Sequence, residues 1–586
     1  CRYMFPGSTG HHTPATPIKG ANSWLNGGCC KGNGWPSAVQ KEMTKIRGAM
    51  TVFDGSLEEA KRKLVGYQQI RCHMVFDIKM EDLTRKARFV AGGHTTDTPK
   101  SLTYASVVTR ESVRLAFLIA ALNGLNILAA DVGNAYLNAD CREKIFFVAG
   151  KEFGSNEGKV LIIRKALYGL KSSGAAWRAL FASTLHDLGY KPSRADPDVW
   201  LKPNVKPDGS EYYEMVLVYV DDILHLSHYP DYDHNPTMQE IGRIYELKAG
   251  SVKEPTYYLG ANIGYAYDEN GTKIWYMSAS DYIEAAAKTV EADLPPGTKL
   301  RGKADRPYNQ SYEPEMDATP HLDADGIRRY QGYIGILRWI VELGRVDIMT
   351  EISLLSSYLV APREGHLHAA LSVFAYLRKN NDQAMFFNPC YYDVNESDFK
   401  PVDQWKDVYG DMSEELPHDA PKPRGQMIVL TALCDASHAS NKVTRRSQTG
   451  FVIYGNCAPI IWFSKKQATI ESSTFGSEFV ALRLCTESLI ALRFKLRMFG
   501  VPVGGPSNVY CDNGAVVNCT ASVEGRLSKK HLSICYHRVR ECCAQGICRI
   551  AKIAGELNVA DLFTKILPTP RRTELVQQLL RHFKAS

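Results

Sequence analysis

The chain has 586 residues, of which 45% are hydrophobic and 23% are charged. This length predicts two to four domains, and this composition excludes a globally disordered protein. With 70 Lys and Arg against 63 Asp and Glu, the net charge of +7 permits nucleic-acid binding through local patches without establishing it. No run approaches ~18 uninterrupted apolar residues, so we expect no membrane span.

The N-terminal segment, residues 1–37, is rich in Gly, Pro, Asn and Cys and has no periodicity, so we expect it to be disordered or vestigial. It lacks the basic and apolar regions of a signal peptide, which predicts a protein that is not secreted. The missing initiator methionine suggests a fragment or a cleaved product. The 15 cysteines have no paired CxxC spacing and are interpreted as reduced thiols of an intracellular protein.

The next part of the chain alternates between strand and helix patterns up to about Lys288. A helix that begins near Ala38 is followed by strands at 72–80 and 85–93. The next helix, at 112–124, has Ser112 as a possible cap and Gly124 as its stop. A strand at 125–132, a helix at 177–190, and two strands about a turn, at 214–220 and 223–227, complete the series.

From about Tyr330 the pattern becomes helical, in three segments that end near Asn380. Residues 386–424 contain Pro and many acids, which predicts a solvated linker. A second α/β unit then runs from Met427 to about Pro568.

Two adjacent carboxylates, Asp221 and Asp222, interrupt the apolar run EMVLVYVDDILHLS. Two buried, unpaired carboxylates would cost several kcal/mol each, so they need a compensating environment. One alternative is a solvated hairpin turn, and the other is a divalent cation such as Mg²⁺. The second alternative requires a partner, and Asp131, which ends the apolar part of ILAADVGNAYLNA, is the candidate.

Together these motifs resemble a known family. DVGNAY at 131–136 and YVDD at 219–222 resemble the palm motifs of retroelement reverse transcriptases, and KALYGLKSSGAAW at 165–177 with SRADPDVW at 193–200 narrows the resemblance to the Pol polyprotein of copia-type LTR retrotransposons. RKARFVAGG, LGRVDIMTEISLLS and CDNGAVV…KKHLSICYHRVRE…ADLFTK fit the same family, so the resemblance covers roughly residues 38–568.

The resemblance implies a right-hand polymerase in which Asp131 and Asp221 hold two Mg²⁺ ions, with Asp222 beside them; Mn²⁺ could substitute. Lys86 and Arg88, two apart on a strand and hence on one face, are either a solvated edge or triphosphate ligands. The other predicted nucleotide-binding residues are Tyr136, which would exclude a 2′-OH, Tyr219, and Ser172, which stands where many relatives have Gln.

The C-terminal unit offers a second acid set, in which each member lies at the end of a regular element: Asp435, Glu478, Asp512 and Asp561, the last with Asn558 as a possible cap. Singly, such acids are ordinary capping residues. Their order resembles the RNase H fold, which implies cleavage of RNA in RNA–DNA hybrids by two further Mg²⁺ ions. A DDE transposase set of Asp435, Asp512 and Glu541 is the alternative, although it leaves Glu478 and Asp561 unused.

The RNase H resemblance has one departure, because IAGELNVAD lacks the mobile His that many relatives carry before the last Asp. Basic residues nearby are either a phosphate-binding patch or a solvated helix face. The candidates for weak contact with nucleic acid are Lys529, Lys530, His531, His537 and Arg540.

The predicted fold class is therefore α+β and α/β multidomain, a fingers-palm-thumb reverse transcriptase followed by an RNase H-like domain. The expected segments are 1–37 disordered, 38–300 fingers and palm, 301–385 helical thumb or connection, 386–427 acidic linker, 428–568 RNase H-like domain and 569–586 C-terminal tail.

The resemblance implies an RNA-directed DNA polymerase with a tethered RNase H, acting on an RNA template, a DNA primer, RNA–DNA hybrid and deoxynucleoside triphosphates. No zinc knuckle, protease or integrase motif is found, so gag, protease and integrase are expected on other polypeptides. The expected location is a virus-like particle in the cytoplasm, and the nucleus. Two alternatives are a degenerate or domesticated protein that binds RNA or DNA without catalysis, and a polymerase of the telomerase or group II intron type.

Overall fold

The computed structural model describes residues 34–78, 85–97, 103–295, 297–300 and 305–583. The predicted disordered segment thus lies outside the described residues, except for 34–37, which begin helix α1 (Gly34–Ile46). Packing divides the chain into two compact units: Cys1–Ser106 with Val132–Asp187, and Val107–Asp131 with Leu188–Ser586. The six segment boundaries expected from the sequence stay predictions.

The first unit contains two small sheets. Strands β3 (Cys72–Ile78) and β4 (Arg85–Ala91) form an antiparallel pair at the places predicted, and α1 packs on β4. The other sheet has the order β1-β7-β6-β2, with the bounds Met50–Val52, Val160–Ile163, Ile145–Val148 and Gln68–Gln69. Helices α2 (Leu57–Lys63), α4 (Ala135–Asn138) and α5 (Ser173–Asp187) complete the unit.

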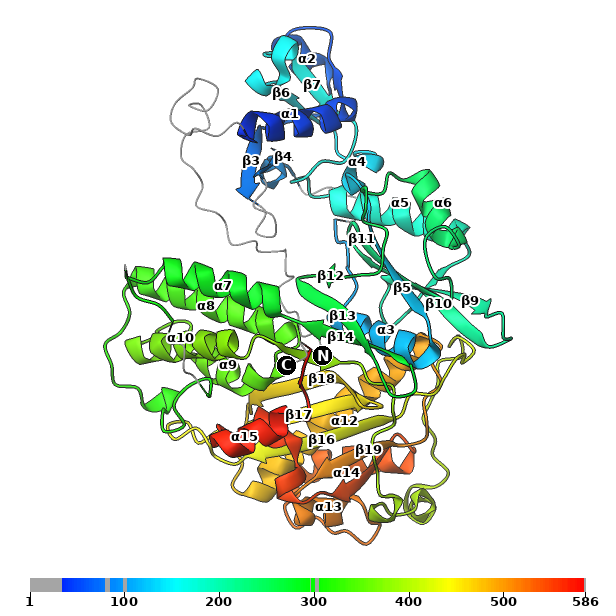
Figure 1. Ribbon diagram of the computed structural model, residues 1–586, viewed down its shortest axis with the longest axis vertical. Helices are drawn as coiled ribbons and strands as arrows, with labels where there is room; N and C mark the ends of the chain where they lie inside the picture. The colour runs from blue at the N-terminus through cyan, green and yellow to red at the C-terminus, as the bar shows by residue number, and fades with distance from the viewer. Residues whose placement is uncertain (1–33, 79–84, 98–102, 296, 301–304, 584–586) are drawn as a thin grey trace. The chain divides into compact units, whose positions relative to one another are not determined.

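The second unit begins with an antiparallel palm sheet of order β5-β11-β10-β9-β8 (Figure 1). The bounds are Asn126–Asp131, Asp222–Ser227, Glu211–Tyr219, Val199–Val205 and Lys191–Pro192. Helix α3 (Arg110–Asn123) packs on this sheet, and α6 (Pro236–Ile244) follows β11. The N-cap of α3 is Thr109, whose hydroxyl accepts the Ser112 N–H, and not Ser112 itself; Gly124 ends the helix at φ 56°, as predicted.

The middle of the second unit is a five-stranded sheet with a helical layer. The sheet order β12-β13-β14-β15-β21 joins Tyr257–Tyr258, Ala261–Tyr267, Lys273–Ser278, Gln383–Phe386 and Arg581–His582. The helices α7 (Ser280–Ala292), α8 (Ala324–Glu342), α9 (Met349–Leu355) and α10 (Glu364–Lys379) pack side by side (Figure 1) and include the three helical segments predicted.

The acidic segment predicted as a solvated linker at 386–427 is exposed over most of its described length, but its part at 387–427, which we call the strap, is also anchored to the rest of the unit. Phe387, Phe399 and Trp405 are buried, and Glu414 pairs with Arg493 at 2.7 Å. The short helix α11 (Lys406–Tyr409) is its only α-helix among the residues described. Acidic composition indicated solvent, but Glu396, Glu414 and Asp419 pair with arginines, and three aromatic side chains enter the core.

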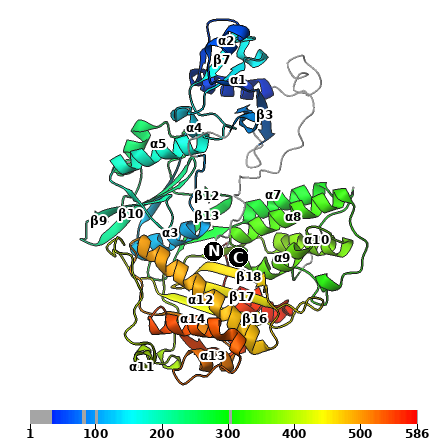
Figure 2. The same cartoon turned by 180° about the vertical axis from the view of Figure 1, so that it is seen from behind.

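The last part of the unit is a five-stranded sheet of order β18-β17-β16-β19-β20. The bounds are Ala458–Lys466, Gln448–Gly455, Leu430–Ser437, Ser507–Cys511 and Cys548–Lys552; the first three strands are antiparallel and the last two run parallel to β16. Figure 2 shows α12 (Thr474–Met498) across this sheet with α14 (Ser533–Ala544) beside it; α13 (Gly514–Thr520) and α15 (Thr569–Val576) follow β19 and β20. This is the predicted RNase H-like fold after a palm.

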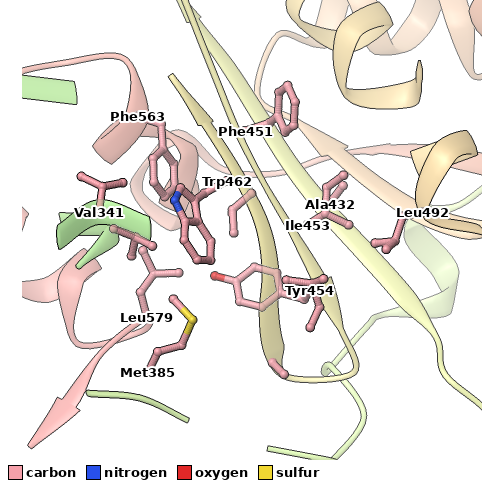
Figure 3. Packing of buried hydrophobic residues seen from close by; sticks show 14 of the residues in the cluster. Val341, Met385, Ala432, Phe451, Ile453, Tyr454, Trp462, Leu492, Phe563 and Leu579 are labelled. Carbon is pink, nitrogen blue, oxygen red and sulfur yellow. The ribbon is translucent and has the colours of Figure 1, made fainter. Parts of the chain in front are cut away.

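One hydrophobic core runs through the second unit, from Val108 to Leu580. Figure 3 shows where the parts meet: Trp462 of β18 lies among Phe563, Val341 and Leu579. The guanidinium of Arg114 on α3 stacks 3.7 Å from the Trp462 ring centroid and donates to the Ile460 carbonyl at 3.1 Å. Of the helices that the structure describes, none has the length and apolarity to cross a membrane.

Candidate active sites

The two adjacent carboxylates lie at the turn between β10 and β11. Tyr219 and Asp222 are the last paired residues of this hairpin, so Val220 and Asp221 form a two-residue turn. Val220 has φ 60°, a left-handed conformation that a β-branched residue rarely adopts. Such strain costs about 1–3 kcal/mol and is found mainly at functional sites. The two explanations of the adjacent carboxylates, a solvated hairpin turn and a bound divalent cation, are therefore compatible, because carboxylates at a turn can also bind a cation.

Asp131 lies beside this turn, as its predicted role requires. In the β5–β11 pairing its Cα partner is Asp222. The ammonium of Lys248 forms an ion pair with Asp131 Oδ2 and lies 3.9 Å from Asp221 Oδ2. Because one nitrogen contacts both carboxylates, the side chains of Asp131 and Asp221 converge on one point.

The segment after α6 holds Asp131 in place. The Asp131 N–H donates to Ser251 Oγ at 3.2 Å, and the Lys248 N–H donates to the Asp131 carbonyl at 2.9 Å. Within the part of the chain that the structure describes, Asp131 Oδ1 is buried without a hydrogen-bond partner. An unpartnered carboxylate oxygen beside a second carboxylate fits a hard divalent cation, which prefers oxygen ligands.

The predicted nucleotide ligands Arg88 and Tyr136 are brought together by a residue that we did not predict. The Arg88 guanidinium lies 5.3 Å from the Tyr168 ring centroid, and the rings of Tyr168 and Tyr136 are 4.9 Å apart. Tyr168 belongs to the LYGLK motif, which was the available signal. Lys86 and Arg88 alternate with buried Ala87 and Phe89 on β4, in agreement with a shared face.

Ser172 has a different environment from the one expected. Its side chain is buried, and its Oγ donates to Glu143 Oε1 at 2.6 Å while its N–H donates to the same oxygen at 2.9 Å. The hydroxyl is thus used within the first unit and is not presented to a nucleotide. Tyr219, another predicted nucleotide ligand, is half-buried at the end of β10.

The four acids of the C-terminal unit converge. Carboxylate oxygens of Asp435, Asp512 and Asp561 lie within 4.8 Å of one another, and ligand atoms of Glu478, Cys511 and Asp512 do the same. Asp512 is common to both groups. Glu541, which the transposase alternative needs, is in neither group of the described residues.

The turn that carries Asp561, a 3-10 helix at Val559–Phe563, is fixed by its cap and by a close approach to the sheet. Asn558 caps it as predicted, accepting the Ala560 N–H at 3.1 Å, and its Nδ2 donates to the Cys434 carbonyl at 3.1 Å. A Cβ at Gly450 of β17 would meet Phe563 at 2.6 Å, so only glycine lets this turn pack so closely.

The electrostatics of the cluster reflect its density of carboxylates. Burial, reinforced by Asp435, Cys511 and Asp512, raises the pKa of Glu478 to about 11. Burial and Asp435 also raise the pKa of Asp512. The ammonium of Lys565 contacts Asp435 and Asp561, and in the described residues Glu478 Oε2 is buried without a partner. These carboxylates need more positive charge than one lysine supplies, which fits a divalent-metal centre.

The predicted nucleic-acid contacts have three different environments. Lys530 and His537 line a surface hollow of about 1270 Å³ together with Arg526 and Tyr536. Lys529 contacts Ser473 at the start of α12, and His531 lies 3.4 Å from Glu471.

Arg540 lines the same hollow but is only 2% exposed. Its guanidinium donates to backbone carbonyls, including those of Ser522 at 2.6 Å and Val523 at 3.0 Å. These bonds fix the loop before α14, and the predicted contact of Arg540 with nucleic acid stays a prediction.

Comparisons with known proteins agree with this geometry. Residues 62–291 match the family model described as "Reverse transcriptase (RNA-dependent DNA polymerase)". The chain is 25% identical to the Pol polyprotein from transposon TNT 1-94 of Nicotiana tabacum, in an alignment that covers 93% of the chain and 37% of the relative. It is 24% identical to the Pol polyprotein from transposon RE1 of Arabidopsis thaliana, in an alignment that covers 85% of the chain and 31% of the relative. The chain therefore spans about a third of the length of these relatives.

A solved structure, the foamy viral protease-reverse transcriptase in complex with double-stranded DNA, aligns with 92% of this chain and 71% of its own, at 12% identity and a TM-score of 0.46. The residues that this family model matches include the palm sheet, which is thus similar to reverse transcriptases. Over most of its length the chain is a homologue of copia-type transposon Pol polyproteins, which confirms the resemblance stated from its motifs.

Proposed function

We propose that the chain is an RNA-directed DNA polymerase with a tethered ribonuclease H, as in copia-type retrotransposons. The observation that carries the proposal is that seven acids from distant segments converge as two separate clusters, one at the palm turn and one at the RNase H-like sheet. The palm cluster lies in the segment that matches the reverse-transcriptase family.

In the proposed polymerase site, Asp131 and Asp221 hold two Mg²⁺ ions, and Asp222 is beside them on the paired strand. When bound, such ions lower the pKa of the primer 3′-OH and stabilise the departing pyrophosphate. The protein supplies fixed positions: the β10–β11 turn sets Asp221, and the β5 pairing with the Ser251 contact sets Asp131. Lys248 must leave its place between the carboxylates for ions to bind.

In the proposed nuclease site, Asp435, Glu478, Asp512 and Asp561 hold two further ions, whose chemistry is to activate water and stabilise the leaving 3′-oxygen. Asn558 and Gly450 hold the turn with Asp561 against the sheet. The substrates are RNA template, DNA primer, RNA–DNA hybrid and deoxynucleoside triphosphates; gag, protease and integrase would act from other parts of the element, in a cytoplasmic virus-like particle and in the nucleus.

Primer extension on poly(rA)/oligo(dT) with Mg²⁺ tests the polymerase. Asp221→Asn should lower the extension rate about 1000-fold or more, because a lost metal ligand removes several kcal/mol of transition-state stabilisation. Asp208→Asn, on the exposed β9–β10 turn, is the matched control and should extend normally. Binding of the primer–template by the unsubstituted chain without any extension would instead support the non-catalytic alternative.

Cleavage of a labelled RNA–DNA hybrid tests the nuclease. Asp435→Asn should stop hybrid cleavage and leave primer extension unchanged, because the two clusters have no residue in common. Glu556→Gln, on the exposed turn before Asp561, is the control. Loss of both activities in Asp435→Asn would contradict two separate sites.

A further inference from the structure

The nuclease cluster contains two candidate ion positions that share Asp512 and differ in their neighbours. One is formed by Asp435, Asp512 and Asp561, and the other by Glu478, Cys511 and Asp512. A cationic side chain of the same chain, Lys565, contacts the first position. The two positions are therefore unequal before any ion binds.

Lys565 is built into the first position. Its Nζ lies 3.2 Å from Asp435 Oδ2, 3.3 Å from Asp435 Oδ1 and 2.5 Å from Asp561 Oδ1. Its backbone N–H donates to the Asp561 carbonyl at 3.0 Å, so the turn that sets Asp561 also sets Lys565. Its ammonium is thus placed between two carboxylates of the first position.

In the described residues Lys565 forms no ion pair with Glu478 of the second position, although its charge still acts on this carboxyl from a distance. Glu478 is 3% exposed, and in the described residues its Oε2 has no hydrogen-bond partner. A buried carboxylate oxygen without a partner carries the full cost of desolvation unless it is protonated or bound to a cation. On the Glu478 side an incoming divalent ion therefore finds a buried oxygen that no hydrogen bond of the described residues occupies.

We propose that Lys565 is the resident cation of this centre, which takes its first divalent ion at Glu478 and Asp512 and its second only when the lysine leaves Asp435 and Asp561. The inference rests on the proposed metal-dependent nuclease. Two features support displacement: the Lys565 side chain is 38% exposed, and its flexible four-carbon stem lets the ammonium move to solvent. An arginine fork held by both carboxylates would be harder to displace.

A Mn²⁺ titration measures the affinity of the second ion directly. Bound ions are counted from the decrease of the EPR signal of free Mn²⁺. The full chain carries Asp221→Asn in all samples, so that the palm contributes little. We expect Lys565→Met to bind the second Mn²⁺ of the nuclease centre about tenfold or more tightly, because a positive charge next to a divalent ion has been removed. Lys565→Arg keeps the charge and should keep the second ion weak.

Two controls separate the possible outcomes. Lys552→Met removes an exposed lysine at the end of β20 and should leave Mn²⁺ binding unchanged. Asp512→Asn, at the residue common to both positions, should remove ions from the centre. If Asp512→Asn weakens binding but Lys565→Met does not tighten it, the proposal for Lys565 is wrong while the metal centre stands. If Asp512→Asn changes nothing, the metal centre fails, and the proposal with it.

Thermal unfolding provides a second readout, in case Lys565→Met folds poorly without metal. A ligand that binds the folded state raises the melting temperature according to its affinity. Added Mn²⁺ should therefore raise the melting temperature of Lys565→Met more than that of the chain with Lys565. Equal increases would overturn the proposal.

Discussion

The buried ion network around Asp347 allows a stability prediction with a definite magnitude. Asp347 has no exposed surface, and Arg345 donates to its two carboxylate oxygens at 2.9 and 2.8 Å. The Tyr376 hydroxyl donates to Asp347 Oδ2 at 2.8 Å, and Arg572 of α15 lies 3.9 Å from it. Burial raises the pKa of Asp347, but the two arginines reverse this and leave it below its ordinary value.

Replacing Asp347 by Ala leaves Arg345 buried without its partner. Breaking a buried pair in this way costs about 3–5 kcal/mol, because the remaining charge is uncompensated. Asp347→Asn keeps the shape and one acceptor, so the loss should be about 1.5–3 kcal/mol, the worth of hydrogen bonds to a charged group. The measurement is the free energy of unfolding in urea, followed by tryptophan fluorescence.

Asp325→Ala is the matched control, because Asp325 forms an exposed ion pair with Arg328 on α8, and an exposed pair contributes about 1 kcal/mol or less. If Asp347→Ala and Asp325→Ala cost the same free energy, the network does not stabilise the fold in the way argued here.

Two further predictions concern the palm turn and the strap. Val220→Gly should raise the free energy of unfolding by up to about 1 kcal/mol, because relief of the left-handed backbone strain exceeds the entropy cost of glycine. Val220→Ala keeps a Cβ and should raise the free energy of unfolding by less. Equal midpoints of urea unfolding for the two variants would show that Val220 is not strained. Burial opposes the charge of Glu414, but Arg493 and Arg497 outweigh burial and lower its pKa. The ionised Glu414 therefore stabilises the folded chain fully above the unfolded pKa of ~4.3, and this stabilisation is lost as the pH falls through the lowered folded pKa. Glu414→Gln should flatten the acid side of the plot of melting temperature against pH, and an unchanged plot would contradict this.

Much of the architecture could be predicted because it depends on residue patterns within short segments of the chain. The alternation in β4 and the apolar runs of β5 and β10 predicted strands, and Gly124 predicted a helix end. Most acids of the two clusters lie at or near the end of a regular element and could be proposed from this position, but Glu478 lies in the second turn of α12 and was identified by the family motifs.

Lys248 could not be predicted in this way, because it contacts Asp131 across 117 residues. Lys565 follows Asp561 by four residues in ADLFTK, which is a local signal, but its contact with Asp435 across 130 residues has no local signature. The anchoring of the strap could not be predicted for the same reason: Phe399 packs on Tyr510 and Glu414 pairs with arginines of α12, contacts that only the folded chain defines. Arg540 looked like a surface residue because its acceptors are carbonyls, which have no sequence signature.

Helix α3 has a consequence for how the chain can be divided into fragments. Ten of its 14 residues are buried, because it packs both on the palm sheet and on β18 of the RNase H-like sheet. A fragment that began in the strap would leave Trp462 without Arg114 and would uncover an apolar wall to water. Chimaeras that exchange the RNase H-like sheet between related chains should therefore carry α3 along with it, because α3 packs on both sheets.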